Sequence, residues 1–291
     1  MKVAVYGKQI PPQHTDYIRR FFDLLEGAGI DTGIFSSFVQ NLGTDVPVPA
    51  AFKVLEQSES IQGYDFLISV GGDGTMLETA TVVRDSGIPV LGINTGRLGF
   101  LSHVDADKYE SALHALVNGR FTIDRRSLLQ VSANNQDLGN FPFALNEVTI
   151  LNQARNSMIS IHVFVNDQFM STYWADGLII ATPTGSTAYS LSCGGPIVTP
   201  DSSTCVLTPI AAHNLNVRPV VISDSNRIAL HATGRDDQFL LSLDSRSFLI
   251  TESTRLEITR APFQVNLVRL EGQGFFNTIH TKLGWAVDKR N

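Results

Sequence analysis

Apolar and polar positions follow two different patterns along the chain, and the first of them fills residues 1–122. Apolar runs of β-strand character at 2–6, 64–70 and 88–93 alternate there with segments of helical periodicity. The clearest helix follows Thr15, its expected N-cap, where the apolar side chains at i, i+3, i+4, i+7 spacing are Ile18, Phe21, Phe22 and Leu25. Strands and helices in this alternation predict a parallel sheet covered by helices on both faces.

Weaker patterns in the same stretch predict four further elements. A short strand is expected at 34–35, a helix around 52–55, a helix at 75–84 capped by its own first residue, and a helix at 109–117. Glycines follow the last two segments and favour helix ends there.

After residue 121 the pattern changes to short apolar runs separated by turn residues. Runs spaced by roughly 8–12 residues are typical of an antiparallel sandwich or a similar β-rich domain. The expected strands lie at 128–131, 144–151, 159–165, 178–180, 206–207, 220–222, 227–232, 239–243, 248–250, 255–258 and 264–268.

The two patterns together predict an α/β plus all-β chain. A Rossmann-like parallel α/β domain is expected at 1–122, followed by a β-sandwich-like domain at 123–270. The final segment, 271–291, includes a helical or extended stretch at 278–285. Spacing leaves open whether this segment returns to the first domain.

Composition narrows the class of protein without changing this picture. Hydrophobic residues make up 43% of the 291 residues, which excludes an intrinsically disordered chain. A net charge of -6 gives no electrostatic footprint for nucleic acid. Cys193 and Cys205 support neither a disulfide framework nor a zinc ribbon, and no apolar run reaches the ~18 residues of a membrane span. We therefore expect a cytoplasmic protein without nucleic-acid or membrane partners.

The most informative motif is the Gly-Gly-Asp-Gly-Thr run from Gly71 to Thr75, which directly follows the apolar strand at 64–70. Ligands meet the carboxyl ends of parallel strands, where glycines let the backbone approach a phosphate and the next helix adds its positive end. A carboxylate in such a turn needs its own function, so Asp73 is a candidate to accept a hydroxyl proton or to hold Mg²⁺. A simple turn after a strand is the alternative.

A second glycine-rich turn, at 92–100, follows the next parallel strand and is expected at the same edge of the sheet. Arg97 in this turn can reach a phosphate there, or it can be a solvated side chain. Other nucleotide and hydrolase motifs are absent: the chain has no Walker A P-loop, no third glycine of the dinucleotide fingerprint and no Gly-x-Ser-x-Gly elbow. The seven histidines show no metal-ligand spacing.

Two polar clusters stand out in the β-rich part. Asn146 and Glu147 interrupt an apolar strand, and a buried polar pair needs partners such as the vicinal hydroxyls of a ribose; exposure at a strand end is the alternative. The segment at 176–192 leads from a strand into a Pro/Gly turn crowded with hydroxyls, suited to an adenine edge, with Tyr189 available for stacking. A plain Ser/Thr-rich loop is the alternative for this segment.

Taken together, these clusters resemble the NAD kinase family in order and spacing, over nearly the whole chain. The first motif is shared with lipid kinases of the diacylglycerol and sphingosine type, whereas the Asn-Glu pair and the Thr-Pro-Thr-Gly-Ser-Thr-Ala-Tyr segment are far more specific. The stretches that carry the resemblance are 71–75, 94–100, 146–147, 176–179, 182–190, 194–196 and 281–285.

The resemblance implies transfer of the γ-phosphate of ATP to the 2′-hydroxyl of the adenosine ribose of NAD, giving NADP. It implies that Asp73 receives the hydroxyl proton and that Gly74 brings the backbone close to the phosphates. Asn146 and Glu147 would hold NAD at its ribose, and Asp176 would contact its nicotinamide half. The implied adenine side of the pocket consists of Thr187, Ala188, Tyr189, Ser190, Leu191 and Ser192.

Three positions depart from the family pattern. Trp174 stands where a basic residue is common, Ser157 lies near another basic or imidazole position, and Arg246 replaces a common amide. Each change is expected to alter contacts to the nicotinamide ribose or to the new phosphate. The resemblance also implies a divalent cation, expected to be Mg²⁺ with ligands that the sequence does not identify, and assembly as a homodimer or homotetramer.

Two other functions stay open. A lipid kinase would explain the first motif, but the chain has no amphipathic or basic membrane-facing stretch. A non-catalytic NAD(P) sensor would keep the pocket, although the intact Asp73 argues against it. In each case the α/β part supplies Asp73 and the β-rich part supplies Asn146 and Glu147, so the site is expected to draw on both.

Overall fold

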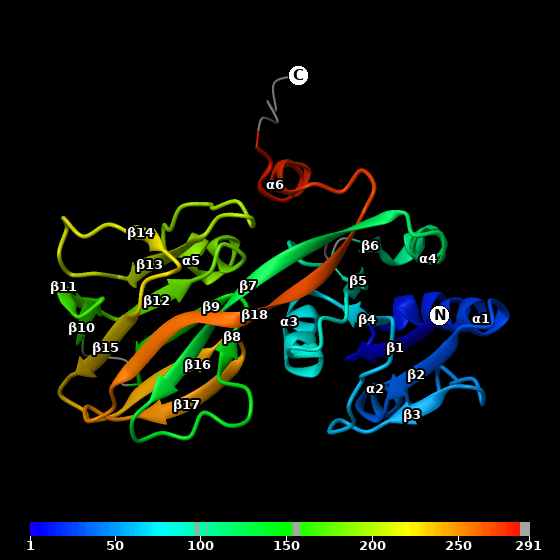
Figure 1. The fold of residues 1–291 in the computed structure, drawn as a ribbon, viewed down its shortest axis with the longest axis horizontal. Coiled ribbons are helices and arrows are strands. Elements are labelled where there is room, and N and C mark those ends of the chain that lie inside the picture. The colour runs from blue at the N-terminus through cyan, green and yellow to red at the C-terminus, as the bar shows by residue number, and fades with distance from the viewer. Residues whose placement is uncertain (97–98, 103, 154–157, 286–291) are drawn as a thin grey trace. The chain divides into compact units, whose positions relative to one another are not determined.

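The computed structural model describes residues 1–96, 99–102, 104–153 and 158–285. The chain divides into two compact units, whose elements are labelled in Figure 1. Unit 1 comprises Met1–Arg125 together with Val265–Asn291, and unit 2 comprises Arg126–Gln264. Unit 2 is therefore a continuous segment inserted into unit 1.

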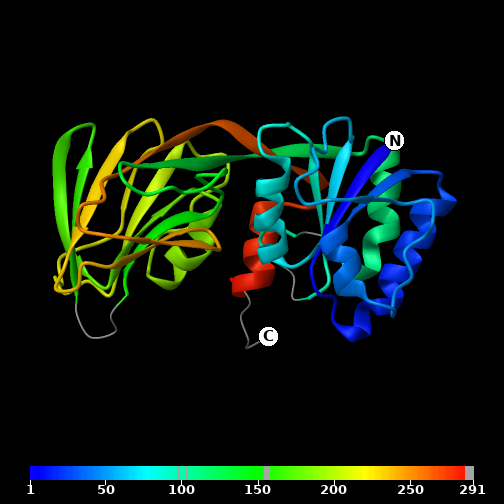
Figure 2. The ribbon, with the colours of Figure 1, turned by 90° about the horizontal axis from the view of Figure 1, so that it is seen from below.

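Unit 1 is built on a parallel sheet in the order β5-β4-β1-β2-β3, with β6 beside β5. The helix α3 lies on one side of this sheet and α1 and α4 lie on the other (Figure 2). The strands are β1 (Lys2–Gly7), β2 (Asp31–Phe35), β3 (Lys53–Leu55), β4 (Phe66–Gly71), β5 (Val90–Asn94) and β6 (Val104–Asp105). The helices are η1 (Pro12–His14), α1 (Thr15–Gly27), α2 (Ser36–Leu42), α3 (Asp73–Val83), η2 (Ala106–Lys108), α4 (Tyr109–Val117) and α6 (Phe275–Leu283).

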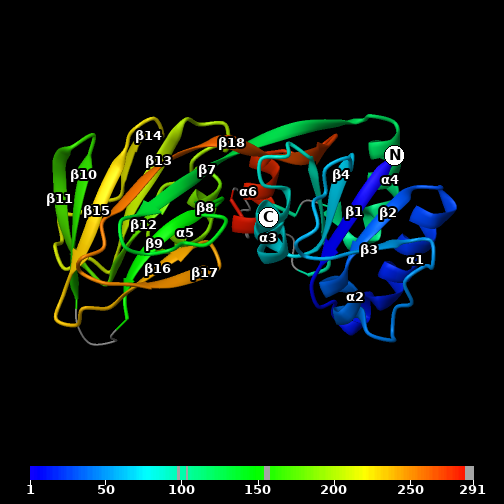
Figure 3. The same ribbon diagram turned by 60° about the horizontal axis from the view of Figure 1, so that its bottom comes forward.

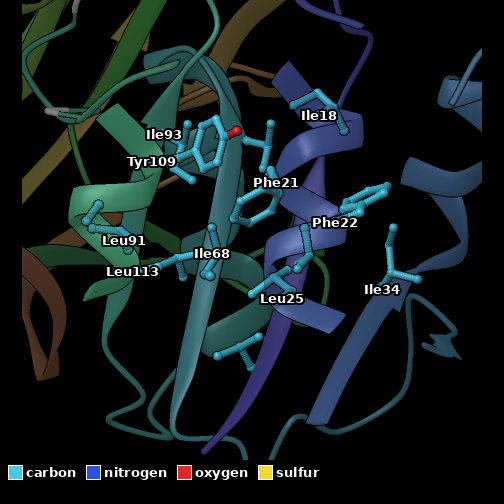
Figure 4. Close-up of a cluster of buried hydrophobic side chains, with 14 of the residues drawn as sticks. Ile18, Phe21, Phe22, Leu25, Ile34, Ile68, Leu91, Ile93, Tyr109 and Leu113 are labelled. Carbon is cyan, nitrogen blue, oxygen red and sulfur yellow. The ribbon is translucent and has the colours of Figure 1, made fainter. Parts of the chain in front are cut away.

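The apolar stripe predicted on the first helix lies at the centre of the unit 1 core (Figure 4). All four of its side chains are buried against the sheet. Phe22 makes edge-to-face contacts with Phe38 and Phe52 at ring-centroid distances of 6.5 and 5.5 Å. Burial of this stripe, rather than helix propensity alone, fixes α1 on the sheet.

Three local predictions in unit 1 are wrong. Thr15 is not the N-cap of α1 but its first residue, with His14 as the N-cap, because the hydroxyl of Thr15 donates back to the carbonyl of Pro12 at 2.8 Å instead of capping the helix. The segment around 52–55 forms the strand β3, which pairs in parallel with β2, because Val54 and Leu55 extend the sheet instead of completing a helical stripe. The helix expected from Thr75 begins two residues earlier, at Asp73, with Gly72 as its N-cap. Thr75 is therefore buried inside the first turn and is not the cap.

Unit 2 consists of two antiparallel sheets that face each other as layers (Figure 3). One sheet has the order β14-β13-β12-β9-β16-β17, and the other includes β11-β10-β15-β18, while β8 pairs with β7. Buried residues of both sheets form one core. The elements are β7 (Phe121–Ala133), β8 (Phe143–Ala144), β9 (Glu147–Asn152), β10 (Ile159–Val165), β11 (Gln168–Ala175), β12 (Gly177–Ala181), η3 (Gly185–Thr187), α5 (Tyr189–Ser192), β13 (Thr204–Ile210), β14 (Val220–Ser223), β15 (Ile228–Thr233), β16 (Phe239–Leu243), β17 (Arg246–Ile250) and β18 (Leu256–Leu270).

The predicted fold class, a parallel α/β part followed by a β-sandwich-like part, is confirmed. The strand β18 pairs with β15 in unit 2 and, through Leu267 and Val90, with β5 in unit 1. The C-terminal helix α6 belongs to unit 1. Within the part of the chain that the structure describes, no helix is both long and apolar enough to cross a membrane.

Truncation of Phe22 tests whether the α1 stripe stabilises unit 1. Its side chain is 1% exposed, so we expect Phe22→Ala to lower the free energy of unfolding by about 3–5 kcal/mol through lost burial and a cavity. Phe276, in the same unit, is 65% exposed. Phe276→Ala is therefore expected to change the free energy of unfolding by no more than about 0.5 kcal/mol. Urea denaturation of both variants measures the difference, and equal losses would contradict this account of the core.

Candidate functional site

The first glycine turn carries the chain from β4 into α3 through a conformation that requires glycine. Gly71 has φ +155°, and a Cβ there would lie 2.2 Å from Oγ1 of Thr75. Asp73 then sits in the first turn of α3, where the helix dipole stabilises a negative charge. Gly74 is exposed, with open space where a Cβ would be, so a ligand can approach the backbone closely there.

The carboxylate of Asp73 joins the two glycine turns. It accepts hydrogen bonds from the main-chain N–H groups of Phe100, Leu101 and Ser102 at 2.7, 3.1 and 3.1 Å. A Cβ on Gly99 would lie 1.6 Å from Oδ1 of Asp73, so the second turn approaches the carboxylate as only a glycine allows. An ionised carboxylate offers about four acceptor positions, which leaves capacity for one further donor.

A cation that the sequence reasoning missed lies at the same edge of the unit 1 sheet. Lys8 directly follows β1, whose Gly7 is in register with Val70 of β4. Its ammonium donates to Glu78 of α3, which also accepts the hydroxyl of Tyr6 at 2.9 Å. Burial and the Glu78 charge raise the pKa of Tyr6, so its hydroxyl stays a donor. The sequence signal that could have identified Lys8 as a candidate site residue is its position directly after an expected strand.

In unit 2, Asn146 and Glu147 lie at the start of β9 with unsatisfied side chains. Oδ1 of Asn146 and Oε2 of Glu147 are buried and have no hydrogen-bond partner among the described residues. Burial raises the pKa of Glu147 to about 8, and the charge of Asp244 adds to the increase. Near neutral pH Glu147 is therefore largely a neutral acid that can donate a hydrogen bond. Orphaned buried polar atoms are destabilising unless a ligand satisfies them.

The hydroxyl-rich turn packs directly on this pair, so the structure brings two predicted clusters together. Oγ1 of Thr182 donates to the carbonyl of Leu145 at 2.6 Å, and the N–H of Thr182 donates to the carbonyl of Asn146 at 2.8 Å. Thr182 Oγ1 also accepts the N–H of Gly185 at 3.1 Å. One threonine thus fixes the turn against the main chain of the Asn-Glu pair.

The segment at 187–192 separates into structural and accessible side chains. Ser190 is buried and its hydroxyl bonds that of Thr208 at 2.8 Å, so it holds the fold together. Tyr189 is 41% exposed, and Ser192 is exposed as well. Thr187, Ala188 and Leu191 have intermediate exposure, and Oγ1 of Thr187 donates to the carbonyl of Thr184 at 3.2 Å. The exposure of Tyr189 leaves its ring accessible to a planar ligand.

Asp176 and Trp174 are separated by one residue in sequence, where β11 leads into β12. The main chain of Asp176 is paired, since its N–H donates to Ile210 at 3.0 Å and its carbonyl accepts the N–H of Asn152 at 3.0 Å, while the residue is exposed. The exposed ring of Trp174 lies 5.1 Å from that of His213. Two other predicted positions, Arg97 and Ser157, fall outside the described residues.

Arg246 is occupied by the main chain. Its guanidinium donates to the carbonyls of Phe141 and Phe143 and lies over the ring of Phe141 at 5.1 Å. Burial lowers its pKa, and Asp244 partly offsets that effect. Arg246 thus supports the main chain from Phe141 to the start of β8 at Phe143, a role that the sequence did not indicate.

The described residues provide no ready-made metal centre. Across 1–96, 99–102, 104–153 and 158–285, no three His, Cys, Asp or Glu side chains gather closely enough to hold an ion. Mg²⁺ is usually bound by one or two carboxylates together with substrate phosphates.

Comparison with known proteins places these features in a family. Residues 145–270 match the family description "ATP-NAD kinase C-terminal domain", and residues 46–121 match "ATP-NAD kinase N-terminal domain". An NAD kinase of Flavobacterium johnsoniae is 41% identical over 294 residues, and one of Bacteroides fragilis is 42% identical over 290 residues. Each alignment covers 100% of both chains.

Solved structures agree with the fold. Yeast NADH kinase complexed with NADH superposes with a TM-score of 0.88 at 22% identity, covering 99% of this chain and 88% of that one. An NAD kinase from Archaeoglobus fulgidus in complex with ATP gives a TM-score of 0.73 at 25% identity, covering 98% and 99%. At 22% identity the yeast enzyme supports the fold alone.

The raised pKa of Glu147 predicts a pH dependence of stability. The folded protein holds this proton up to a pKa of about 8, against an ordinary value of 4.5, so the unfolded chain binds fewer protons between these values. The free energy of unfolding therefore falls as the pH rises from about 4.5 to 8, by up to roughly 5 kcal/mol at about 1.36 kcal/mol per pKa unit.

Glu147→Gln removes this titration and is expected to flatten much of that decline, while Asp244, whose pKa burial also raises, retains part of it. Urea denaturation at several pH values measures the effect. Glu252→Gln, at an exposed position of the same unit, serves as the control and should reproduce the wild-type slope. An unchanged slope in Glu147→Gln would show that Glu147 is already ionised in the folded state.

Proposed function

The chain belongs to the NAD kinase family, and from this premise we propose that it transfers the γ-phosphate of ATP to the 2′-hydroxyl of the adenosine ribose of NAD, giving NADP. The observation that carries the proposal is the buried pair of orphaned side-chain atoms at Asn146 and Glu147. An amide and a neutral acid side by side match two vicinal hydroxyls, each of which donates and accepts.

We propose that Asp73 acts as the general base of the reaction. Its carboxylate keeps one acceptor position after bonding three main-chain N–H groups, which suits the proton of the 2′-hydroxyl. As the ribose oxygen bonds the γ-phosphorus, the proton moves to Asp73 and the bond from the γ-phosphorus to the β,γ-bridging oxygen breaks. The products are NADP and ADP.

Charge on the transferring phosphoryl group is met by the backbone at Gly74, by the N-terminus of α3 and by Lys8. We propose that Lys8 exchanges its contact with Glu78 for a phosphate oxygen. Mg²⁺ enters in this proposal as part of the MgATP substrate, in keeping with the lack of a cluster of three ligands among the described residues. Phosphoryl transfer then depends chiefly on positioning and charge neutralisation.

The NAD side of the proposal rests on unit 2. Thr187 and Ala188 are proposed to read the adenine, and Tyr189, partly exposed, to stack beside it. Ser190 and Leu191 support this turn, and Ser192 borders the pocket from its exposed position. Asp176 and Trp174, exposed after and within β11, are proposed to meet the nicotinamide half.

We further propose that the enzyme works in the cytoplasm as a homodimer or homotetramer. Its two cysteines are free thiols, as a reducing compartment maintains them. The strand β11 pairs with β10 at the end of its sheet and exposes Phe169 and Trp174. An edge strand with large apolar side chains is suited to contact with a second copy.

The competing functions predict different products in one assay. NAD, diacylglycerol and sphingosine are offered as acceptors with ATP and Mg²⁺, and product formation is followed for each. NADP alone supports the proposal, a phosphorylated lipid supports the lipid kinase, and binding of NAD without any product supports a sensor. Curated relatives at about 40% identity are NAD kinases over their whole length, which favours the first outcome.

Replacement of Asp73 tests the general base. Asp73→Asn keeps the size of the side chain but removes its basicity, so we expect kcat for NADP formation to fall at least ~10²-fold. Asp65→Asn, at an exposed aspartate of the same unit, is the matched control and should stay close to wild type. A dehydrogenase-coupled assay measures both, and wild-type activity in Asp73→Asn would remove Asp73 from the mechanism.

Gly99 provides an independent test of the way the carboxylate is held. Gly99→Ala places a Cβ 1.6 Å from Oδ1 of Asp73 and must displace the carboxylate, so kcat/KM is expected to fall about 10²-fold. The control is Gly96→Ala, whose Cβ lies 3.7 Å from Oδ1 of Asn94 in ordinary contact, and about twofold or less is expected there. Equal activity of the two variants would mean that the position of Asp73 does not limit the rate.

A further inference from the structure

Asp244 is a residue of unit 2 for which neither the family resemblance nor the sequence suggested a role. It lies in the two-residue turn between β16 and β17 and has φ +51°, a left-handed conformation that aspartate tolerates better than most residues. Burial raises the pKa of its carboxyl group, and hydrogen bonds from main-chain N–H groups oppose that increase. An acid in such a backbone conformation, with its residue only partly exposed, calls for a compensating role.

The carboxylate of Asp244 accepts three consecutive main-chain N–H groups at the start of β9. Oδ2 accepts from Leu145 at 2.8 Å, and Oδ1 accepts from Asn146 at 2.8 Å and from Glu147 at 3.1 Å. The N–H of Asp244 donates back to the carbonyl of Glu147 at 3.0 Å. One residue therefore makes four hydrogen bonds to the segment that carries the Asn-Glu pair.

The β16 side of the sheet does not supply these bonds. The ladder between β9 and β16 ends at Val148 and Leu243, short of the three N–H groups in question, whereas the ladder of β9 with β12 reaches Glu147 through Ala181. The carbonyls of Leu145 and Asn146 are bonded by Thr182, and that of Glu147 by Asp244. The main chain of the pair is thus fully satisfied inside the protein, while side-chain atoms of both residues lack partners among the described residues.

We propose that Asp244 is a positioning residue for NAD: its carboxylate holds the main chain of Leu145 to Glu147 so that the side chains of Asn146 and Glu147 face the acceptor ribose. The proposal rests on the NAD kinase function proposed above. Only a group without donors can accept three converging N–H groups, which accounts for a carboxylate at this position rather than an amide. Its negative charge also discourages ionisation of Glu147.

Two substitutions distinguish the effect of the Asp244 carboxylate from the effect of the backbone conformation of its turn. Asp244→Asn turns an NH₂ group toward an N–H donor, and Asp244→Gly removes the carboxylate while suiting φ +51° better than any other residue. Asp224→Asn is the matched control, because Asp224 is a buried aspartate of the same unit that pairs with Arg260 at 3.2 Å, away from the Asn-Glu pair.

Steady-state kinetics and amide hydrogen exchange are measured on the full-length protein. For both Asp244 variants we expect KM for NAD to rise at least about tenfold, as one lost charge-assisted hydrogen bond implies, with KM for ATP unchanged. Exchange at the amides of residues 145–147 is expected to accelerate more than elsewhere in unit 2. Asp224→Asn should leave KM for NAD and exchange at 145–147 unchanged, whatever its effect on stability.

The outcomes distinguish the proposal from a merely structural role and from failure of the function itself. If Asp244 only stabilises the fold, the variants lose active protein and thus maximal rate, with both KM values and the relative exchange at 145–147 as in wild type; that result overturns the proposal. If the wild-type protein forms no NADP, the proposed function fails, whereas the exchange data still report on whether Asp244 holds the segment.

Discussion

The structure depends on one interaction used twice: a carboxylate that accepts three main-chain N–H groups in succession. Asp73 binds residues 100–102 in unit 1, and Asp244 binds residues 145–147 in unit 2. In both places the main chain leaves regular hydrogen bonding next to predicted site residues. A buried N–H group without a partner there would be destabilising. Each carboxylate therefore satisfies main-chain N–H groups in the fold, and the proposed chemistry uses groups that folding already requires.

The two acids at the predicted positions have different surroundings. Burial raises the pKa of Glu147 to about 8, and the charge of Asp244 adds to the increase. The main-chain N–H of Glu147 is bonded to Asp244, while Oε2 of its side chain has no partner among the described residues. Asp73, in contrast, lies in the first turn of α3 and accepts three main-chain N–H groups with its carboxylate.

The sequence was sufficient to predict those structural features whose physical signal is local. The stripe on α1 and the glycines before Asp73 were predictable because periodicity and turn chemistry extend over only a few residues. The strand β3 was not, since three residues pairing with β2 carry no period of their own. The role of Asp244 could not be predicted either, because its bond to Leu145 joins residues 99 positions apart. The sequence shows Lys8 directly after an expected strand. Only the register of β1 with β4 places it at the edge of the sheet where the first glycine turn begins.

The return of the chain through β18 has a consequence for synthesis on the ribosome. Unit 2 is continuous, so it can fold as soon as its last residue emerges, whereas unit 1 still lacks residues 265–285, which follow unit 2 in the chain. Until then β5 pairs with β4 and β6 but lacks Leu267 of β18 beside Val90, and an incompletely paired strand is a site for wrong pairing with other chains. A chain that stops before residue 265 would therefore carry a folded unit 2 attached to an incomplete unit 1.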